Sequence, residues 1–222
     1  MRVGLGARQP VMTESTTAPP YYLPNKIGRS ILLALEEVIG HTGVNAVLNL
    51  ADLASRLNNY PPDNLDLGYR FEELSALQAA LERMYGPRGG RGLALRTGRA
   101  WFKYGLREFG TMLGMTELAF RLLPLNMKLK ATVEGFADIY NRYTDQVVQL
   151  EEQPGGMLWQ ILRCPVCWGR HADTPCCHLE VGMLQETLYW ASGGKNFLVD
   201  EIACCARGDP ACTILIHRLP LD

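Results

Sequence analysis

The chain has 222 residues, enough for one substantial domain with a hydrophobic core. Apolar residues make up 47% of it and charged residues 20%, an ordinary globular mixture, and 22 Lys and Arg against 23 Asp and Glu give a formal net charge of -1. This balance argues against a nucleic-acid-binding protein, because such proteins bind phosphates through excess positive charge.

The N-terminal segment shows no pattern of a packed structure. Residues 13–20 are rich in Thr and Pro and have little to bury, so residues 1–20 are expected to form a disordered lead-in. Basic residues occur there without the apolar segment of a secretory signal, and no window reaches roughly 18 unbroken apolar residues. We therefore expect a cytoplasmic protein without a membrane span, whose thiols are reduced unless they bind metal.

Residues 21–143 are expected to form a helical part. Between Ile27 and Val38 apolar residues recur at spacings of three and four, and Gly40 ends this first predicted helix. Further helices are predicted over residues 44–57, 71–85, 93–123 (with a break near 110–114) and 125–143. The Pro, Asn and Asp content of residues 58–68 predicts a loop.

The glycine-rich segment GPRGGRG at residues 86–92 is expected to break the helical pattern. A phosphate-binding loop is the alternative, but the segment lacks both G-x-G-x-x-G and the Walker pattern with its Lys-Ser/Thr. Glycines that join helices are far commoner, so we expect a helix junction here.

After residue 143 the apolar period changes from 3.6 to 2. Residues 146–153 and 157–163 predict one β-hairpin, and residues 197–206 and 212–218 predict a second. A helix is predicted between the hairpins, over residues 178–192. This order predicts an α+β fold with an antiparallel four-stranded sheet flanked by the N-terminal helices. We expect one domain over residues 21–222, with a helical part (21–143) and a β-β-α-β-β part (144–219).

The cysteines are concentrated in the β-rich part and predict a metal site. Zinc takes about four N, O or S ligands, and a C-x-x-C turn can present two sulfurs to one ion. Adjacent cysteines point to opposite faces of a strand, so one member of each pair is expected to be a ligand. One alternative is that several of these cysteines only fill the core, and a weaker one is redox chemistry at the C-x-x-C motif. If a metal is bound, His171 could serve as a spare ligand. The seven cysteines are Cys164, Cys167, Cys176, Cys177, Cys204, Cys205 and Cys212.

The stretch from Cys164 to Pro220 resembles the 4-vinyl reductase domain family, through CPVCWGR, CCHLEVGMLQETLYWASGG and EIACCARGDPACTILI. Over residues 21–143 the resemblance is architectural only. It implies a fold similar to subunits of TRAPP-type trafficking complexes, and a homodimer. Such domains occur in bacteriochlorophyll biosynthesis proteins and as sensory domains of phenol- and toluene-responsive regulators.

The resemblance to the aromatic-sensing relatives implies a zinc ion held by Cys177, Glu201, Cys204 and Cys212. Glu201 and Cys204 are three residues apart and would face opposite ways in a regular strand. Either the strand ends or bulges there, or Cys205 is the ligand. Four protein ligands would make the zinc structural, whereas three would leave an open, Lewis-acidic position. The pair at 164 and 167 lies outside the implied pattern and is either structural or part of a second, weaker site.

Three functions compete at this point. The first is a module that binds a hydrophobic or aromatic small molecule, a tetrapyrrole or hydrocarbon, in a pocket; the alternative for its aromatic and Met side chains is ordinary core. The second is reduction of a vinyl group on a chlorophyllide precursor, or an accessory role in it, although the chain has no nucleotide-binding fingerprint. The third is an interaction subunit that acts through dimerisation. The candidate pocket residues are Trp101, Phe102, Phe109, Met112, Phe120, Tyr189 and Trp190.

Overall fold

The computed structural model describes residues 20–110, 120 and 122–221, without the side chain of Phe109. Residues 1–19 of the expected lead-in and the candidate pocket residue Met112 lie outside the described residues.

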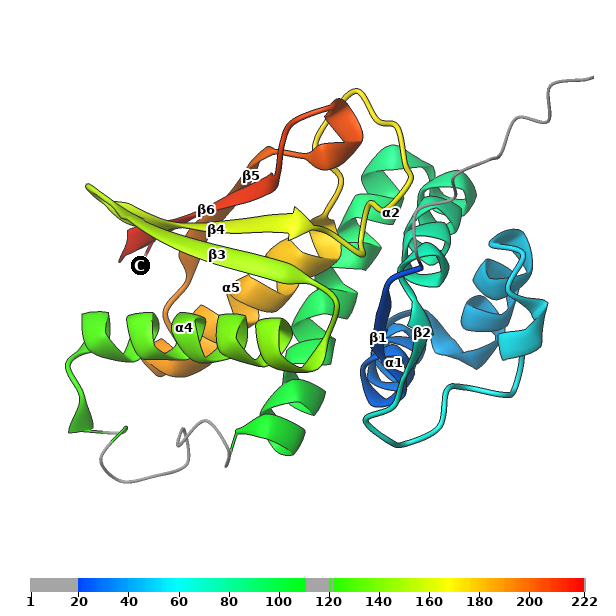
Figure 1. Ribbon diagram of the computed structural model, residues 1–222, viewed down its shortest axis with the longest axis horizontal. Coiled ribbons are helices and arrows are strands. Elements are labelled where there is room, and N and C mark those ends of the chain that lie inside the picture. The colour runs from blue at the N-terminus through cyan, green and yellow to red at the C-terminus, as the bar shows by residue number, and fades with distance from the viewer. Residues whose placement is uncertain (1–19, 111–119, 121, 222) are drawn as a thin grey trace, which may run out of the picture.

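The helical part is built on two long kinked helices and a short strand pair (Figure 1). The chain enters through β1, which pairs antiparallel with β2. The elements of this part are β1 (Tyr22–Pro24), α1 (Asn25–Leu50), the 3-10 helix η1 (Ala54–Arg56), β2 (Leu67–Arg70), α2 (Phe71–Phe109) and α4 (Leu125–Tyr143).

The two predicted helix breaks at glycine are confirmed, while several element bounds around them differ from the prediction. The glycine-rich segment does break the helical pattern: α2 consists of two helical segments that meet at a kink at Gly86, where the backbone is non-helical with a φ of 73°, and the second segment begins within 86–92 instead of at residue 93. Gly40 likewise is non-helical with a φ of 73°, so the first helical segment of α1 ends where predicted, and the second ends at Leu50 instead of residue 57. Glycine tolerates positive φ without a steric penalty, and the helix therefore changes direction there. The predicted loop 58–68 also ends in strand β2, which the chain forms only by pairing with β1.

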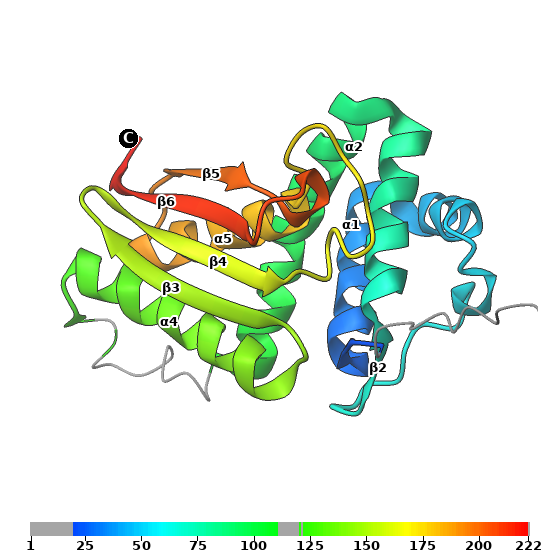
Figure 2. The ribbon, with the colours of Figure 1, turned by 45° about the horizontal axis from the view of Figure 1, so that its top comes forward.

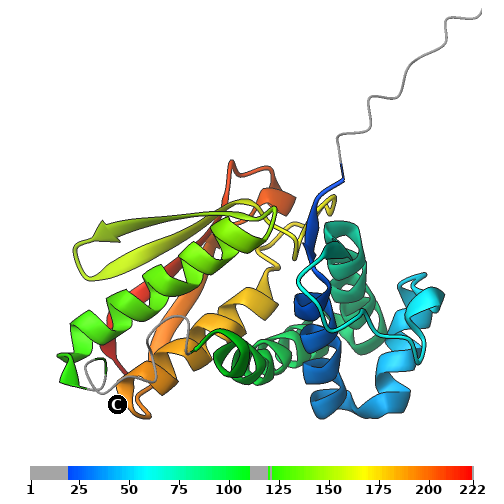
Figure 3. The same ribbon diagram turned by 60° about the horizontal axis from the view of Figure 1, so that its bottom comes forward.

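The sheet agrees with the sequence pattern. Both predicted hairpins are present, and the strand order β3-β4-β6-β5 is antiparallel throughout. Helices α4 and α5 lie along one face of the sheet, as Figure 3 shows. The expected α+β fold is therefore confirmed. These elements are β3 (Val147–Gln153), β4 (Gly156–Arg163), α5 (His178–Ser192), β5 (Phe197–Ala203), the 3-10 helix η2 (Cys205–Arg207) and β6 (Cys212–Pro220).

Helix α1 is long and apolar enough to cross a membrane by length and composition. In this structure its apolar residues Ile31, Leu32 and Leu35 are fully buried in the hydrophobic core. That core also contains Tyr69 and Phe71 of the neighbouring elements, so the helix packs as a core helix does.

Helices α2 and α5 cross at two glycines. A Cβ atom on Gly98 would lie 2.0 Å from the carbonyl oxygen of Leu179, and one on Gly182 would lie 2.1 Å from that of Leu95. Only glycine permits this backbone approach. The crossing fixes the N-terminal end of α5 against α2.

Glu180 of α5 is a buried carboxyl group inside this packing. It is 2% exposed, and its Oε1 atom has no hydrogen-bond partner among the described residues. Burial raises the pKa of Glu180 to about 8. The folded state therefore holds a proton that the unfolded chain releases at about pH 4.3.

The Glu180→Gln variant is expected to remove a pH dependence of stability. In the wild type, the free energy of unfolding falls as pH rises from the unfolded-state pKa to the folded-state pKa, because the folded state binds more protons there. Above pH 8 the variant should be more stable, by on the order of 5 kcal/mol, and near pH 4 the two should agree. Urea unfolding of both proteins from pH 5 to 9 measures this, and parallel curves would refute it.

Candidate metal centre and adjoining cavity

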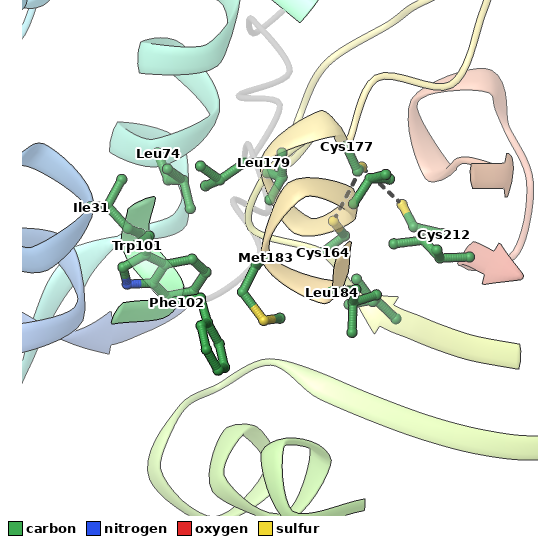
Figure 4. Packing of buried hydrophobic residues seen from close by; sticks show 14 of the residues in the cluster. Ile31, Leu74, Trp101, Phe102, Cys164, Cys177, Leu179, Met183, Leu184 and Cys212 are labelled. Atoms are coloured by element: carbon green, nitrogen blue, oxygen red, sulfur yellow. Dashed lines mark hydrogen bonds between the residues drawn. The ribbon is translucent and has the colours of Figure 1, made fainter. Parts of the chain in front are cut away.

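Six of the seven cysteines meet where the loop before α5 approaches the turn between β5 and β6. Their sulfurs are connected by S···S contacts of 3.3 to 3.9 Å, well beyond the roughly 2.05 Å of a disulfide bond. Each of these side chains is 5% exposed or less. Figure 4 shows three of the sulfurs turned toward one another. The six residues are Cys164, Cys167, Cys176, Cys177, Cys204 and Cys212.

A bulge at the end of β5 brings Glu201 and Cys204 to the same side. The pairing register with β6 shifts between Glu201 and Ala203, and the strand ends there. The backbone N–H of Cys204 then donates to the carboxylate of Asp209 at 2.8 Å, which holds the turn. Of the alternatives that the sequence leaves open, the bulged and ended strand is the one present.

Cys205 is not part of the cluster. Its sulfur lies 4.0 Å from the carbonyl oxygen of Ile161. Its backbone N–H points the other way and donates to the Sγ of Cys212 at 3.2 Å. Cys204, not Cys205, is therefore the member of this pair that is positioned to bind a metal.

The four residues implied by the family resemblance come together. The ligand atoms of Cys177, Glu201, Cys204 and Cys212 all lie within 4.8 Å of one another. The three sulfurs form a triangle with sides of 3.6, 3.8 and 3.9 Å. A zinc ion with Zn–S bonds of about 2.3 Å has tetrahedral edges of about 3.8 Å, so the triangle matches one face of a zinc site.

Glu201 supplies the fourth corner of that site. Its Oε2 atom accepts the backbone N–H of Cys177 at 2.7 Å, which orients the carboxyl group. Its Oε1 atom is buried and has no hydrogen-bond partner among the residues that the structure describes. Such an orphaned oxygen beside three sulfurs is a ligand position, and the residues present therefore fit zinc.

A second set of four ligand atoms consists only of sulfurs, from Cys164, Cys167, Cys177 and Cys212. The sulfurs of Cys164 and Cys177 are 3.5 Å apart, and those of Cys167 and Cys212 are 3.3 Å apart. The C-x-x-C motif thus joins the same cluster as the implied ligands. The spacing of the two cysteines in this motif is the sequence signal for metal binding. The sequence alone does not show that the motif lies beside the implied ligands.

The surroundings of the cluster are electropositive. Cys177 is the N-cap residue of α5, where the helix dipole favours negative charge. Arg170 pairs with Glu82 at 2.5 Å, while its Nη1 atom is buried without a hydrogen-bond partner in the described part of the chain. Burial raises the pKa of the Cys164 thiol to about 12 and, together with the charge of Cys204, that of Glu201 to about 9. A bound cation would reverse both shifts, because it stabilises the deprotonated ligands.

A cavity of about 560 Å³ adjoins the cluster. Its walls come from α2, from the loop before α5, from α5 and from β5, and Figure 2 shows how this loop runs from the sheet to α2. Cys176 and Glu201 belong to the wall on the side of the cluster. Arg88 and Arg91 of α2 also line the cavity, and neither has a hydrogen bond or ion pair with another described residue.

His178 also lines this cavity and is partly buried. Burial, with the positive charge of Arg91, lowers the pKa of His178 to about 4, so the imidazole is neutral near pH 7. The two arginines and this histidine are site residues that sequence reasoning missed. The only sequence signal was GPRGGRG, which contains Arg88 and Arg91 and was interpreted as a helix junction.

The aromatic residues expected to line a pocket lie in the core instead of beside this cavity. Phe102 is 3% exposed and lies 6.1 Å, between ring centroids, from Trp190. Phe120 stacks on the other side with its centroid 5.8 Å from that of Trp190. The indole of Trp101 donates to the Ser30 hydroxyl at 2.9 Å and borders a cavity of only about 30 Å³.

Two further candidates have other positions. Tyr189 is 43% exposed and lines a separate pocket of about 500 Å³ instead of the core. The side chain of Phe109 lies outside the described residues, as does Met112. The aromatic pocket therefore stays a prediction.

No protein-family model matches the sequence. The bacteriochlorophyll synthase 23 kDa chain of Cereibacter sphaeroides is 41% identical over 117 residues, which cover 48% of this chain and 56% of that protein. The chain thus matches little more than half of the length of this curated relative.

Two solved structures share the fold at low sequence identity. The Fe(II) unliganded H-NOX protein from K. algicida has a TM-score of 0.55 and 14% identity, over 90% of this chain and 97% of that one. The H-NOX protein from S. oneidensis in the Fe(II)NO ligation state has a TM-score of 0.53 and 12% identity, over 87% and 99%. The chain therefore has an α+β fold like that of the H-NOX proteins.

Proposed function

We propose that this protein is a small-molecule-binding domain in which a structural zinc centre forms one wall of the ligand cavity. The observation that carries this is the cavity of about 560 Å³ bounded by Cys176 and Glu201 on one side and by α2 on the other. Ligand sites of proteins are concave, and they span roughly 300 to 1,000 Å³. The cavity is large enough for such a ligand.

The zinc ion would be held by Cys177, Glu201, Cys204 and Cys212, and four protein ligands leave it no position for catalysis. Bound zinc would supply cross-links between the start of α5 and the β5–β6 turn. Helix α5 and strand β5, which leads into that turn, contribute residues to the cavity wall, so the ion would hold the wall rigid. The cytoplasmic location and the homodimer expected from the sequence belong to this proposal, and native mass spectrometry measures the oligomeric state.

The ligand that we propose is a tetrapyrrole with free carboxylate groups, an intermediate of bacteriochlorophyll synthesis. The relative named for that synthesis supports the pathway, and the chemistry of the cavity supports the ligand class. Arg88 and Arg91 have no hydrogen bond or ion pair with any residue that the structure describes, and they suit carboxylates, which arginine binds in a bidentate manner. Leu95, Val181 and Val199 supply apolar wall for a macrocycle.

His178 adds a group that can bind the central metal of a tetrapyrrole. It lines the same cavity as the two arginines, and imidazole is the commonest axial ligand of haem iron. Work on the H-NOX family describes haem in those proteins. Haem is therefore one member of the ligand class to be compared.

Replacing both Arg88 and Arg91 with alanine is expected to weaken tetrapyrrole binding by about 100-fold or more, because each charge-assisted hydrogen bond contributes about 1.5 to 3 kcal/mol. The measurement is an absorbance titration with protoporphyrin IX, its dimethyl ester and haem. The wild type should prefer the free acid over the ester, and the double variant should lose that preference. Arg96→Ala is the matched control, since Arg96 is exposed on α2 and does not line the cavity.

Equal affinity of the wild type for acid and ester would refute the role of the arginines, and failure to bind any of the three would refute the ligand class. The second candidate is a vinyl reductase or its accessory subunit, which the synthase name of the relative favours. Reduction of a divinyl chlorophyllide with added NADPH would distinguish it, since a binding domain alone gives no turnover.

A further inference from the structure

We propose that the cysteine cluster holds two zinc ions instead of one, with the sulfurs of Cys177 and Cys212 bridging them. This inference extends the zinc centre of the proposed function and rests on it. The implied four-residue site would be one half of the centre. The second half would use Cys164 and Cys167, to which the resemblance assigns no ligand role.

The argument begins with the two sets of ligand atoms. One set contains Glu201 and Cys204 and the other contains Cys164 and Cys167, yet both contain Cys177 and Cys212. In each set all ligand atoms lie within 4.8 Å of one another, and neither set includes both pairs. A single four-coordinate ion can therefore use only one of the two pairs.

The shared sulfurs have the spacing that two joined tetrahedra require. Cys177 and Cys212 are 3.6 Å apart at Sγ, close to the edge of about 3.8 Å expected for tetrahedral zinc thiolates. Two tetrahedra that share this edge need two more ligands on each side. A thiolate sulfur has lone pairs for two metal ions, so both shared residues can bridge.

The second pair touches the bridging sulfurs directly. Cys164 lies 3.5 Å from Cys177, and Cys167 lies 3.3 Å from Cys212, between sulfur atoms (Figure 4 shows the first of these contacts). Both side chains are 3% exposed or less. Cysteines that only filled the core would pack against carbon atoms, whereas these two extend the ligand cluster.

The charge balance allows the second ion. One zinc with three thiolates and the Glu201 carboxylate has a net charge of -2, by the arithmetic of the four ligands. A second zinc that displaces the thiol protons of Cys164 and Cys167 adds two positive and two negative charges, so the net charge is unchanged. The N-cap of α5 and Arg170 thus face the same net charge in both states. Two protons are released to solvent for the second ion.

The test is the zinc stoichiometry of the full chain, reconstituted with zinc under reducing conditions and measured by native mass spectrometry and elemental analysis. We expect two zinc ions per chain in the wild type and one in the Cys164→Ala/Cys167→Ala double variant. The matched control is Cys205→Ala, which removes a neighbouring thiol outside both ligand sets and should keep two. A second measurement needs no variant: the cadmium-substituted wild type should show two coupled ¹¹³Cd resonances, because bridging sulfur transmits scalar coupling.

The outcomes separate this inference from the proposed function. One zinc in the wild type that persists in the double variant, with a single cadmium resonance, overturns the second site and leaves the zinc of the proposed function in place. One zinc that the double variant loses also overturns the inference and places the ion in the all-sulfur set. A chain that binds no zinc overturns both. If the double variant does not fold, the zinc stoichiometry and the cadmium spectrum of the wild type alone distinguish one bound ion from two.

Discussion

Replacing Cys212 with serine is expected to strip the bound metal and lower the melting temperature by about 8 to 16 °C. Cys212 is fully buried and belongs to both sets of ligand atoms, so no metal-binding arrangement of the cluster retains its geometry without it. Loss of a structural metal site is among the changes that destabilise by about 4 kcal/mol or more, and 1 kcal/mol shifts the melting temperature of a chain of this size by about 2 to 4 °C. Calorimetry and zinc analysis of the same sample give both values.

The control for this experiment is Cys205→Ser. Cys205 neighbours a ligand position, but its sulfur contacts the Ile161 carbonyl instead of the cluster. The zinc content of the Cys205→Ser variant should match that of the wild type. If Cys212→Ser also retained its zinc and its melting temperature, the cluster would be ordinary packing of small thiols.

The Gly182→Ala variant is expected to lose about 3 kcal/mol of stability, near the upper end of what overpacking a core costs. The added methyl group would lie 2.1 Å from the carbonyl oxygen of Leu95, and a backbone atom cannot turn away as a flexible side chain can. Helices α2 and α5 must therefore separate. Because both helices line the large cavity, the variant should also bind protoporphyrin IX, the probe of the proposed ligand class, more weakly. Urea unfolding and the absorbance titration measure the two effects.

Gly92→Ala is the matched control on α2. A Cβ atom at Gly92 would have nothing within 4 Å, and Gly92 is not among the residues with positive φ. Alanine is a better helix former than glycine by about 1 kcal/mol, so this variant should be more stable than the wild type. The two glycine variants should therefore shift stability in opposite directions. Similar destabilisation by both would mean that glycine flexibility, not close packing, explains the crossing.

The local sequence pattern determined the elements whose ends are marked by local signals. Helices α4 and α5 begin and end at the predicted residues, and the two hairpins lie within a few residues of their predicted bounds. Pro124 precedes α4, and Gly193 in the left-handed conformation follows α5, so the stop and start signals are in the chain itself. The helix breaks at Gly40 and Gly86 were predicted as well, but the start of the helical segment after each break was not, because no local signal marks it.

The sequence by itself also determined that the chain concentrates its thiols in one segment and that four residues of a family-like pattern are present. Only the tertiary structure decided that the sulfur of Cys164 contacts that of Cys177 and that the sulfur of Cys167 contacts that of Cys212. It also decided that Arg88 and Arg91 of α2 line a cavity beside the cluster. The physical reason is that these arrangements depend on a β bulge, on strand pairing and on the close crossing of two helices. Each of these features brings together residues that are far apart in the chain, so a local sequence pattern does not predict it.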